Sequence, residues 1–289
     1  MNTQKILILG AGGMLARALA EALRARGTEL VALDRAACDI TRSEDVVSTL
    51  DRHRPTAVIN CSAYTNVDLC EKNPEQANAV NGTGPGNLAD ACGRFGSTLV
   101  HFSTDYVFDG SPRRPLRPED PTGPASAYGI SKLRGEQLIQ KNPPPRWLII
   151  RTAWLYGPGG NNFVETMLKV GRAGKPLRVV NDQVGCPTNT HDLAAATLEL
   201  LDRNASDVWH ISNTGKTTWF DFARAIFEEY GLSPDLQPIT SADWKTMKPD
   251  SAPRPAYSVL DTTAYANLAG KPMPDWRAAL RKYRAGSGG

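Results

Sequence analysis

The chain has 289 residues, of which 41% are hydrophobic, and its formal net charge is +3 at pH 7. This length is enough for one large domain or two modest ones, each with a hydrophobic core. Its basic residues are spread along the chain, so we expect no nucleic-acid-binding surface. No apolar run reaches membrane-spanning length, and the five cysteines are widely spaced without a Cys-x-x-Cys pair, so we expect a cytoplasmic protein with reduced thiols and no membrane contact.

The amino-terminal residues predict a strand, a glycine turn and a helix. Residues 5–9 are an apolar run short enough for a buried parallel strand, and they lead into Gly10-Ala-Gly-Gly-Met-Leu-Ala16. Apolar residues at helical spacing follow at once. Such a turn presents backbone N–H groups and a positive helix end to a pyrophosphate, with Gly10 permitting the tight turn and Gly13 the close approach of phosphate. Taken alone, the cluster fits an ordinary turn about as well as a cofactor loop.

Asp34 and Arg35 follow the next strand-like run, residues 29–33. An acid roughly 20 residues after the glycine turn commonly binds the ribose hydroxyls of a dinucleotide, although a turn residue after a strand is the alternative. Asp34 favours the free 2′-hydroxyl of NAD, whereas the Arg35 guanidinium could accommodate the extra phosphate of NADP. The sequence leaves the choice between NADPH and NADH open.

A proton-transfer pair is predicted on the helix expected at 126–141. The strand-like run at 97–103 ends in Ser103, Thr104 and Asp105, at the sheet edge where open α/β folds bind ligands. Tyr128 and Lys132 lie four residues apart, on one helix face. A nearby ammonium favours a phenolate and eases proton transfer near neutral pH. In isolation this spacing is more often a solvated surface pair.

The alternation of elements predicts an α/β fold with a doubly wound parallel Rossmann sheet and a smaller C-terminal substrate lobe. Strand-like runs at 5–9, 29–33, 57–61, 97–103 and 147–152 alternate with helical segments near 14–26, 43–53, 74–94 and 126–141. Helices are also expected at 163–172 and 191–202, whereas the proline-broken stretch 234–276 has no clear periodicity. We expect a dinucleotide-binding domain of residues 1–154, to which 188–213 return, and a substrate lobe of 155–187 and 214–289.

Thr104, Tyr128 and Lys132, in this order behind a nucleotide-binding unit, resemble the catalytic arrangement of the short-chain dehydrogenase/reductases. Further passages narrow the resemblance to the dTDP-4-dehydrorhamnose reductase family among their extended members. They cover nearly the whole chain: Ser103-Thr-Asp-Tyr-Val-Phe-Asp-Gly110, Tyr128-Gly-Ile-Ser-Lys132, Arg151-Thr-Ala-Trp154, Gly160-Asn-Asn-Phe163, Asn181-Asp-Gln-Val-Gly-Cys-Pro-Thr188 and Arg254-Pro-Ala-Tyr-Ser258.

The resemblance implies an NAD(P)H-dependent enzyme that reduces the C4 keto group of dTDP-4-dehydro-L-rhamnose to give dTDP-L-rhamnose. It implies that Tyr128 donates the proton, that Lys132 holds the nicotinamide ribose and lowers the Tyr128 pKa, and that Thr104 binds the carbonyl oxygen. The implied cofactor contacts are Gly13, Met14 and Leu15 at pyrophosphate, Asp34 at ribose, Asp39 and Ile40 near adenine, and Ala63, Tyr64 and Thr65 along the channel. Thr104, Asp105 and Trp154 would contact the sugar nucleotide, although Trp154 could instead simply close the core.

No metal is expected. Some members of this family hold a metal between subunits through carboxylates, one of them at the position that aligns with Ala18 here. No cluster of His, Cys, Asp and Glu has recognisable ligand spacing. Both a monomer and a homodimer stay open.

The same residues distinguish this activity from those of related enzymes. A sugar-nucleotide dehydratase typically has Asp then Glu after the Thr, but Tyr106 follows Asp105 here. A 4-epimerase usually has a small residue after the Ser or Thr. Two alternatives stay open: a reductase of another dTDP-4-keto-6-deoxy sugar, and a non-catalytic regulatory relative that binds a partner enzyme.

Overall fold

The fold is built on one parallel six-stranded sheet. The computed structural model describes residues 5–286. The strands lie in the order β10-β5-β4-β3-β1-β2, and all their pairings are parallel. They are β1 (Lys5–Leu9), β2 (Glu29–Leu33), β3 (Ala57–Asn60), β4 (Thr98–Thr104), β5 (Trp147–Thr152) and β10 (Asp207–His210). The predicted doubly wound Rossmann sheet is confirmed, and its strand order reverses at β1 and β3, where such sheets bind ligands.

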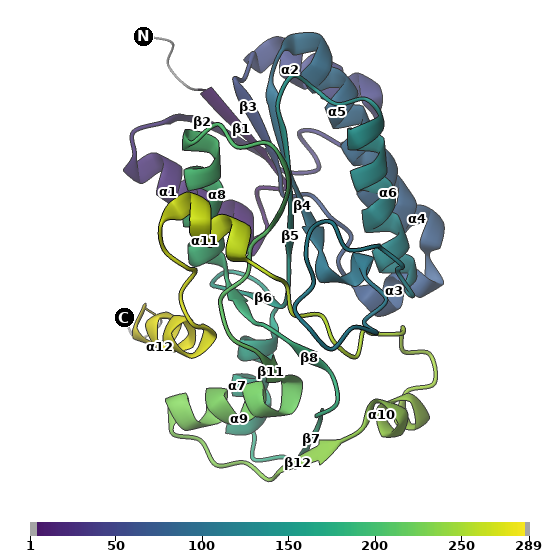
Figure 1. Ribbon diagram of the computed structural model, residues 1–289, viewed down its shortest axis with the longest axis vertical. Helices are drawn as coiled ribbons and strands as arrows, with labels where there is room; N and C mark the ends of the chain where they lie inside the picture. The colour runs from purple at the N-terminus through teal and green to yellow at the C-terminus, as the bar shows by residue number, and fades with distance from the viewer. Residues whose placement is uncertain (1–4, 287–289) are drawn as a thin grey trace.

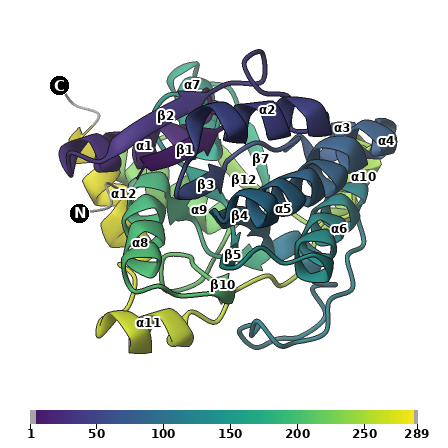
Figure 2. The same ribbon diagram turned by 90° about the horizontal axis from the view of Figure 1, so that it is seen from above.

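Helices cover both faces of this sheet (Figure 1 and Figure 2). One face carries α1 (Met14–Ala25) and α8 (Thr190–Asp202). The other carries α2 (Ser43–His53), α5 (Gly84–Phe95) and α6 (Ala127–Lys141). The strands are therefore buried on both sides, which explains why they read as continuous apolar runs in the sequence.

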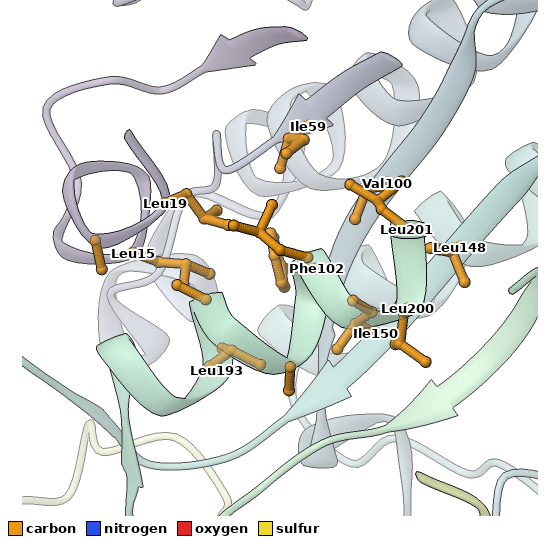
Figure 3. Close-up of a cluster of buried hydrophobic side chains, with 14 of the residues drawn as sticks. Leu15, Leu19, Ile59, Val100, Phe102, Leu148, Ile150, Leu193, Leu200 and Leu201 are labelled. Carbon is orange, nitrogen blue, oxygen red and sulfur yellow. The ribbon is translucent and has the colours of Figure 1, made fainter. Parts of the chain in front are cut away.

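Alternate strand residues supply two separate cores. Ile6 and Ile8 point into the cluster under α1 and α8, whereas Leu7 and Leu9 point into the cluster under α2 and α5. Figure 3 shows the first cluster, with helix residues such as Leu15 and Leu193 against the strand residues. Each fully buried side chain of this kind stabilises the fold by about 1.5–3 kcal/mol relative to its exposed state. These cores fix the carboxyl ends of the strands, where the candidate site lies.

The segment predicted as one helix at 74–94 is interrupted. It consists of α4 (Pro74–Asn78), a π-helical turn η1 (Ala79–Thr83) and α5. The wide turn lets the Asn81 side chain accept from the Tyr64 N–H at 2.8 Å and donate to the Tyr64 carbonyl at 3.0 Å. Its amide also donates to Ser131 Oγ on α6 at 3.0 Å. A π-turn often marks a functional region, and here it clamps the loop that follows β3.

The later part of the chain forms a smaller body beneath the sheet in Figure 1, around a cluster that includes Tyr156, Phe222, Phe227 and Trp276. Its elements are β6 (Leu155–Tyr156), α7 (Phe163–Arg172), β7 (Leu177–Val180), β8 (Val184–Gly185), β9 (Thr188–Asn189), β11 (Thr217–Thr218), α9 (Trp219–Tyr230), β12 (Leu236–Ile239), α10 (Ser241–Met247) and α12 (Trp276–Gly286). Between α10 and α12 the chain forms α11 (Thr263–Ala269), which lies against the large sheet. Two short helices, α3 (Val67–Lys72) and η2 (Asp105–Val107), lie beside the sheet edge.

The stretch 234–276, which showed no periodicity, contains β12, α10 and α11. Tyr265 of α11 packs in the cluster under the large sheet and not in that of the smaller body. In contrast to the expected lobe of 214–289, α11 therefore packs against the large sheet. The division of the chain into two lobes itself stays a prediction. Within residues 5–286, no helix is long and apolar enough to cross a membrane.

Candidate active site

A cavity of about 410 Å³ opens at the carboxyl ends of β1, β2 and β3. Gly10 has φ +79°, and a Cβ added there would lie 2.7 Å from the Ser62 nitrogen, so only glycine fits. Gly13 is the N-cap of α1 and has no side chain to accept from the first turn, and a Cβ added at Gly12 would meet nothing within 4 Å. Uncapped N–H groups facing open space fit a dinucleotide pyrophosphate.

The rim of this cavity carries most of the predicted cofactor residues. The residues that line it are Gly10, Gly13, Asp34, Arg35, Asp39, Ile40, Ala63 and Tyr64, together with Gly12, Cys38, Cys61, Ser62, Gln76 and Val80. Asp34 Oδ1 accepts from the Ala37 N–H at 3.1 Å. The exposed Arg35 is held at the rim by Asp39, whose Oδ2 accepts from Arg35 Nε at 3.1 Å.

A second cavity of about 550 Å³ continues from the first, since Gly13, Cys61 and Ala63 line both. It brings together the remaining predicted site residues: Met14, Leu15, Thr65, Thr104, Asp105, Tyr128, Lys132 and Trp154. Trp219 and Arg254, from the later part of the chain, also line it. Residues far apart in the sequence thus meet where the groove of the sheet reaches the smaller body.

Tyr128 stands in the first turn of α6, which begins where Ser126 Oγ accepts from the Gly129 N–H at 3.1 Å. Burial raises the Tyr128 pKa, and a hydrogen bond between its hydroxyl and Thr104 offsets only part of this effect. The expectation that Lys132 lowers the Tyr128 pKa is therefore wrong in this structure, because desolvation of the phenolate dominates. A phenol that keeps its proton is the form that a proton donor needs.

Lys132 lies one turn further along the same face and is buried. Its Nζ donates to the Phe102 carbonyl at 2.5 Å and lies 3.3 Å from His101 Nε2. Burial lowers the Lys132 pKa to about 8, against the opposing effects of Glu136 and Cys61. Lys132 is therefore anchored to β4 in this structure.

Asp105 is a buried carboxyl with one unmatched oxygen. Its Oδ1 accepts from Thr104 Oγ1 at 3.0 Å, whereas Oδ2 has no partner among the described residues. Burial raises the Asp105 pKa to about 6, and the Ser258 and Thr104 side chains nearby oppose this shift. A buried carboxylate oxygen without a donor, in the wall of a cavity, is suited to accept from a ligand hydroxyl.

Trp154 forms part of the wall of the second cavity. Its backbone has φ +48°, which is unusual for a bulky residue, and its ring stacks on Trp219 with centroids 3.5 Å apart and planes at 9°. A Cβ added to Gly185 would lie 2.5 Å from the indole, so that glycine makes room for it. The side chain is half-buried and lines the second cavity, and so it does more than close the core.

A third cavity of about 290 Å³ adjoins the second through Trp219 and Arg254, which line both. Its other lining residues are Phe163, Met167, Arg178, Val179, Val180, Gln183 and Trp244. Arg254 Nη2 donates to Asp68 Oδ1 of α3 at 2.9 Å, which ties this wall to the sheet edge. The three cavities thus form one continuous groove with arginines and aromatic rings at its far end.

Comparison with known proteins agrees with this geometry. The family model described as the RmlD substrate binding domain matches residues 4–286. The chain belongs to this family. A dTDP-4-dehydrorhamnose reductase from Mycolicibacterium smegmatis is 43% identical over 281 residues, covering 96% of this chain and 84% of the relative. A spore coat polysaccharide biosynthesis protein SpsK from Bacillus subtilis is 42% identical and covers 96% of both chains.

A solved structure from the RmlD family's dTDP-4-dehydrorhamnose reductases, the Bacillus anthracis protein in complex with NADP, matches with a TM-score of 0.93 at 34% identity. The match covers 98% of this chain and 99% of that one. A UDP-glucose 4-epimerase from Thermus thermophilus, in complex with NAD, matches at 22% identity with a TM-score of 0.81, which shows a shared fold alone. The family assignment therefore rests on the full length of the chain.

Two lining residues of this RmlD-family site, Trp219 and Arg254, were not predicted from the sequence. Arg254 lies in one of the passages that carried the resemblance, but nothing in its local sequence indicates which cavity it lines. Trp219 begins α9 and gives no periodic signal of its own. Only the packing of the later segments against the sheet edge brings these two side chains to the groove.

The glycine turn gives a direct test of cofactor binding. We expect Gly13→Val to weaken NADPH binding strongly, because a branched side chain at the N-cap of α1 occupies the approach to the helix end. NADPH is titrated into the folded variant and the dissociation constant compared with the parent. Gly93→Val, at an exposed α5 glycine with nothing within 4 Å, is the matched control. Undiminished affinity in folded Gly13→Val would remove the turn from the cofactor site.

Arg35 gives a test of cofactor choice. We expect Arg35→Ala to lower the ratio of kcat/KM for NADPH to that for NADH by about 10- to 100-fold, since a charge-assisted hydrogen bond to phosphate contributes about 1.5–3 kcal/mol. Arg42→Ala is the control, because Arg42 is equally exposed and pairs with Asp45 but lines neither cofactor cavity. An unchanged ratio in Arg35→Ala would make Arg35 a solvated surface charge.

Asp105 gives a test by pH. The pKa of Asp105 is higher in the folded state than in the unfolded state. The protonated carboxyl therefore contributes its full stabilisation of the fold below the unfolded-state pKa near 3.8, and this stabilisation is lost as pH rises through about 6. The unfolding free energy of Asp105→Asn relative to the parent should therefore rise by about 2–3 kcal/mol from pH 4 to pH 8. Asp109→Asn should show the opposite sign, since hydrogen bonds from Ser111 hold the Asp109 pKa below its ordinary value. Parallel pH curves for parent and Asp105→Asn would contradict the burial argument.

Proposed function

We propose that this chain reduces the C4 keto group of dTDP-4-dehydro-L-rhamnose to give dTDP-L-rhamnose, with NADPH or NADH as the reductant. The observation that carries the proposal is the convergence of Thr104, Tyr128 and Lys132 where the dinucleotide groove meets the cavity walled by Trp154. Membership of the RmlD family and relatives named dTDP-4-dehydrorhamnose reductase at about 40% identity support the same substrate.

The protein's part in the chemistry is binding and proton transfer. When bound, the reduced nicotinamide supplies the hydride. Tyr128 gives its hydroxyl proton to the oxygen that develops negative charge at C4, and burial keeps this phenol protonated until then. Lys132 holds the nicotinamide ribose beside the tyrosine, and Thr104, hydrogen-bonded to Tyr128, binds the same oxygen.

Cofactor binding is assigned to the first cavity and the inner wall of the second. Gly10, Gly13, Met14 and Leu15 would hold the pyrophosphate at the uncapped end of α1, and Asp34 with Arg35 the ribose. Asp39 and Ile40 would lie near adenine, and Ala63, Tyr64 and Thr65 along the channel. These residues come from the dinucleotide-binding domain proposed for 1–154 with 188–213.

Substrate binding is assigned to the groove beyond Tyr128. The unmatched Asp105 oxygen would accept from a sugar hydroxyl, and Trp154 would cover the sugar ring. The Arg254 guanidinium suits the pyrophosphate of the sugar nucleotide. The aromatic wall of the third cavity, with Phe163 and Trp244, suits the planar base. The smaller lobe, 155–187 and 214–289 without α11, would thus hold the nucleotide half.

Reduction of a different dTDP-4-keto-6-deoxy sugar is the second candidate. A relative from Streptomyces niveus named dTDP-4-keto-6-deoxy-D-glucose reductase is 39% identical and covers 96% of both chains. The intact Thr104, Tyr128 and Lys132 weigh against a non-catalytic regulatory protein, and Tyr106 after Asp105 weighs against a dehydratase. A monomer and a homodimer are both compatible with the groove.

Separate assays with two substrates distinguish these candidate functions. The chain is supplied with NADPH and either dTDP-4-dehydro-L-rhamnose or dTDP-4-keto-6-deoxy-D-glucose, and loss of reduced nicotinamide is followed. We expect the rhamnose precursor to have the larger kcat/KM, and NMR of the product to show dTDP-L-rhamnose. A larger value for the glucose-configured sugar would establish the second candidate, and turnover of neither sugar would remove both.

A further inference from the structure

Lys132 is the outer member of a chain of three buried polar side chains. Its Nζ lies 3.3 Å from His101 Nε2, and His101 Nδ1 lies 3.1 Å from Asn60 Nδ2. Asn60 Oδ1 accepts from the Ser62 N–H at 3.0 Å. Lys132, His101 and Asn60 are at most 2% exposed, and the latter two are paired neighbours on β3 and β4. The roles proposed above leave His101 and Asn60 unused.

The hydrogen bonds decide which imidazole nitrogen carries the proton. The Ser62 N–H donates to Asn60 Oδ1, so this oxygen must face Ser62. The NH₂ group of the same amide therefore faces His101 Nδ1 and donates to it. A neutral imidazole whose Nδ1 accepts has its hydrogen on Nε2, and that N–H points at Lys132 Nζ. The reverse assignment would turn the asparagine and set two donors, its amide and the Ser62 N–H, against each other.

The amine of Lys132 completes this pattern only without its extra proton. A neutral amine donates to the Phe102 carbonyl and uses its lone pair to accept from His101 Nε2–H, so every group is matched. An ammonium has no lone pair, and it would face the imidazole N–H as a second donor. The geometry therefore favours the neutral amine at this position.

We propose that His101 is a positioning residue for Lys132, held by Asn60 as the Nε2–H tautomer so that it donates to Nζ and stabilises the neutral amine. Lys132 is then a group whose charge depends on pH and not a permanent cation. His101 acts through Lys132 and is not among the residues that line the three cavities.

The charged groups around Lys132 favour its ammonium form, but burial outweighs them. Glu136 of α6 and Cys61 at the end of β3 both raise the Lys132 pKa, and yet burial still lowers it to about 8. Glu136 is itself engaged by Arg151 of β5, whose Nη2 donates to it at 2.7 Å. Burial holds the His101 pKa well below its ordinary value, and a positive charge on Lys132 lowers it further, so the imidazole stays neutral whether or not Lys132 is charged.

The tautomer can be read directly by long-range ¹H–¹⁵N NMR of the histidine side chains, with His101 assigned from its absence in His101→Leu. We expect the Nε2–H form at His101, unchanged from pH 5 to pH 9. His210 is the internal reference, since its Nδ1 lies 2.9 Å from the Leu116 carbonyl and must carry the hydrogen. An Nδ1–H form at His101, or a charged His101 titrating near pH 6.5, would overturn the proposal.

The Asn60→Asp substitution tests the proposal through the pH dependence of kcat. A carboxylate there accepts from both Ser62 N–H and His101 Nδ1–H, so Nε2 would present its lone pair to Lys132 and favour the ammonium. Loss of the Lys132 proton removes one of the N–H donors that would hold the nicotinamide ribose, so activity should fall on the alkaline side of the kcat–pH profile. We expect Asn60→Asp to move this alkaline limb up by about one pH unit or more. The same substitution in a His101→Leu background should give less than half that shift, because the carboxylate charge remains but the relay is absent.

An equal shift in both backgrounds would show a charge effect without His101 and contradict the proposal. The kinetic arm rests on the proposed reductase function, whereas the NMR arm needs no turnover. A chain that reduces neither sugar but shows the Nε2–H form would therefore refute the function alone. If Asn60→Asp does not fold, the NMR measurement on the parent protein still decides the tautomer.

Discussion

Replacing Tyr128 by phenylalanine is expected to lower kcat for the 4-keto sugar by about 10²–10⁴-fold, the usual contribution of general acid catalysis. The ring keeps its edge-on contact with Tyr106, 5.5 Å between centroids, so the pocket keeps its shape. Only the hydroxyl that is hydrogen-bonded to Thr104 is removed. Binding of NADPH should persist, which stopped-flow turnover and equilibrium titration on the same sample would show.

The control for this variant is Tyr265→Phe. It also deletes a buried tyrosine hydroxyl, here one that donates to Glu199 at 2.9 Å, but on α11 and away from the groove. Its kcat should match that of the parent. If Tyr128→Phe reduced the sugar at nearly the parental rate, the Tyr128–Lys132 pair would be a structural feature of α6 and the proton would come from elsewhere.

Replacing Glu136 by glutamine is expected to destabilise the fold by about 3–5 kcal/mol, since it leaves a buried arginine without its counter-charge. Glu136 lies one turn beyond Lys132 and accepts from Arg151 Nη2 at 2.7 Å and from Nε at 3.0 Å, with both side chains at most 5% exposed. Ser103 Oγ also donates to Glu136. The pair thus fastens the catalytic helix α6 to β4 and β5, directly before Thr104.

Urea unfolding measures this loss as a lower midpoint at constant slope. Glu29→Gln is the control, because Glu29 pairs with Lys5 at 3.0 Å but is about half exposed, and such surface pairs contribute only about 0.2–1 kcal/mol. Equal losses for the two variants would mean that the Glu136–Arg151 pair does not hold α6 in place.

The sheet and the glycine turn were predictable because their signals are local. The strand at 5–9 is apolar on both faces, and Gly10 follows it directly, so the sequence contains both the element and its function. The helix predicted at 126–141 is observed as Ala127–Lys141, and the structure shows Ser126 as its cap. The spacing of Tyr128 and Lys132 predicted a shared helix face, and both side chains line the second cavity.

The Tyr128 pKa could not be predicted from that spacing. Its direction depends on how deeply the phenol is buried and on where the Lys132 amine finds partners, and those are the Phe102 carbonyl and His101 on β4. Both are contacts across the fold, for which an i, i+4 pattern carries no information.

The far end of the groove was missed for a related reason. Among the described residues β12 pairs with β7 alone, as an edge strand that contains Pro238, so no apolar alternation marks it. The helix α10 does have a local signal, since Thr240 and Asp243 form a capping box, but none of its residues is buried. Its Trp244 gains a role only by closing the third cavity with Trp219.

The central claim is that the groove at Tyr128 reduces a keto group at C4 of a dTDP-linked sugar. The most direct measurement supplies NADPH with deuterium at the transferable position of the nicotinamide, together with dTDP-4-dehydro-L-rhamnose, and locates the label by NMR and mass spectrometry. The expected result is dTDP-L-rhamnose with one deuterium at C4, formed by the parent and at least about 100-fold more slowly by Tyr128→Phe. An unlabelled sugar, or a label carried equally fast by both proteins, would contradict the assignment.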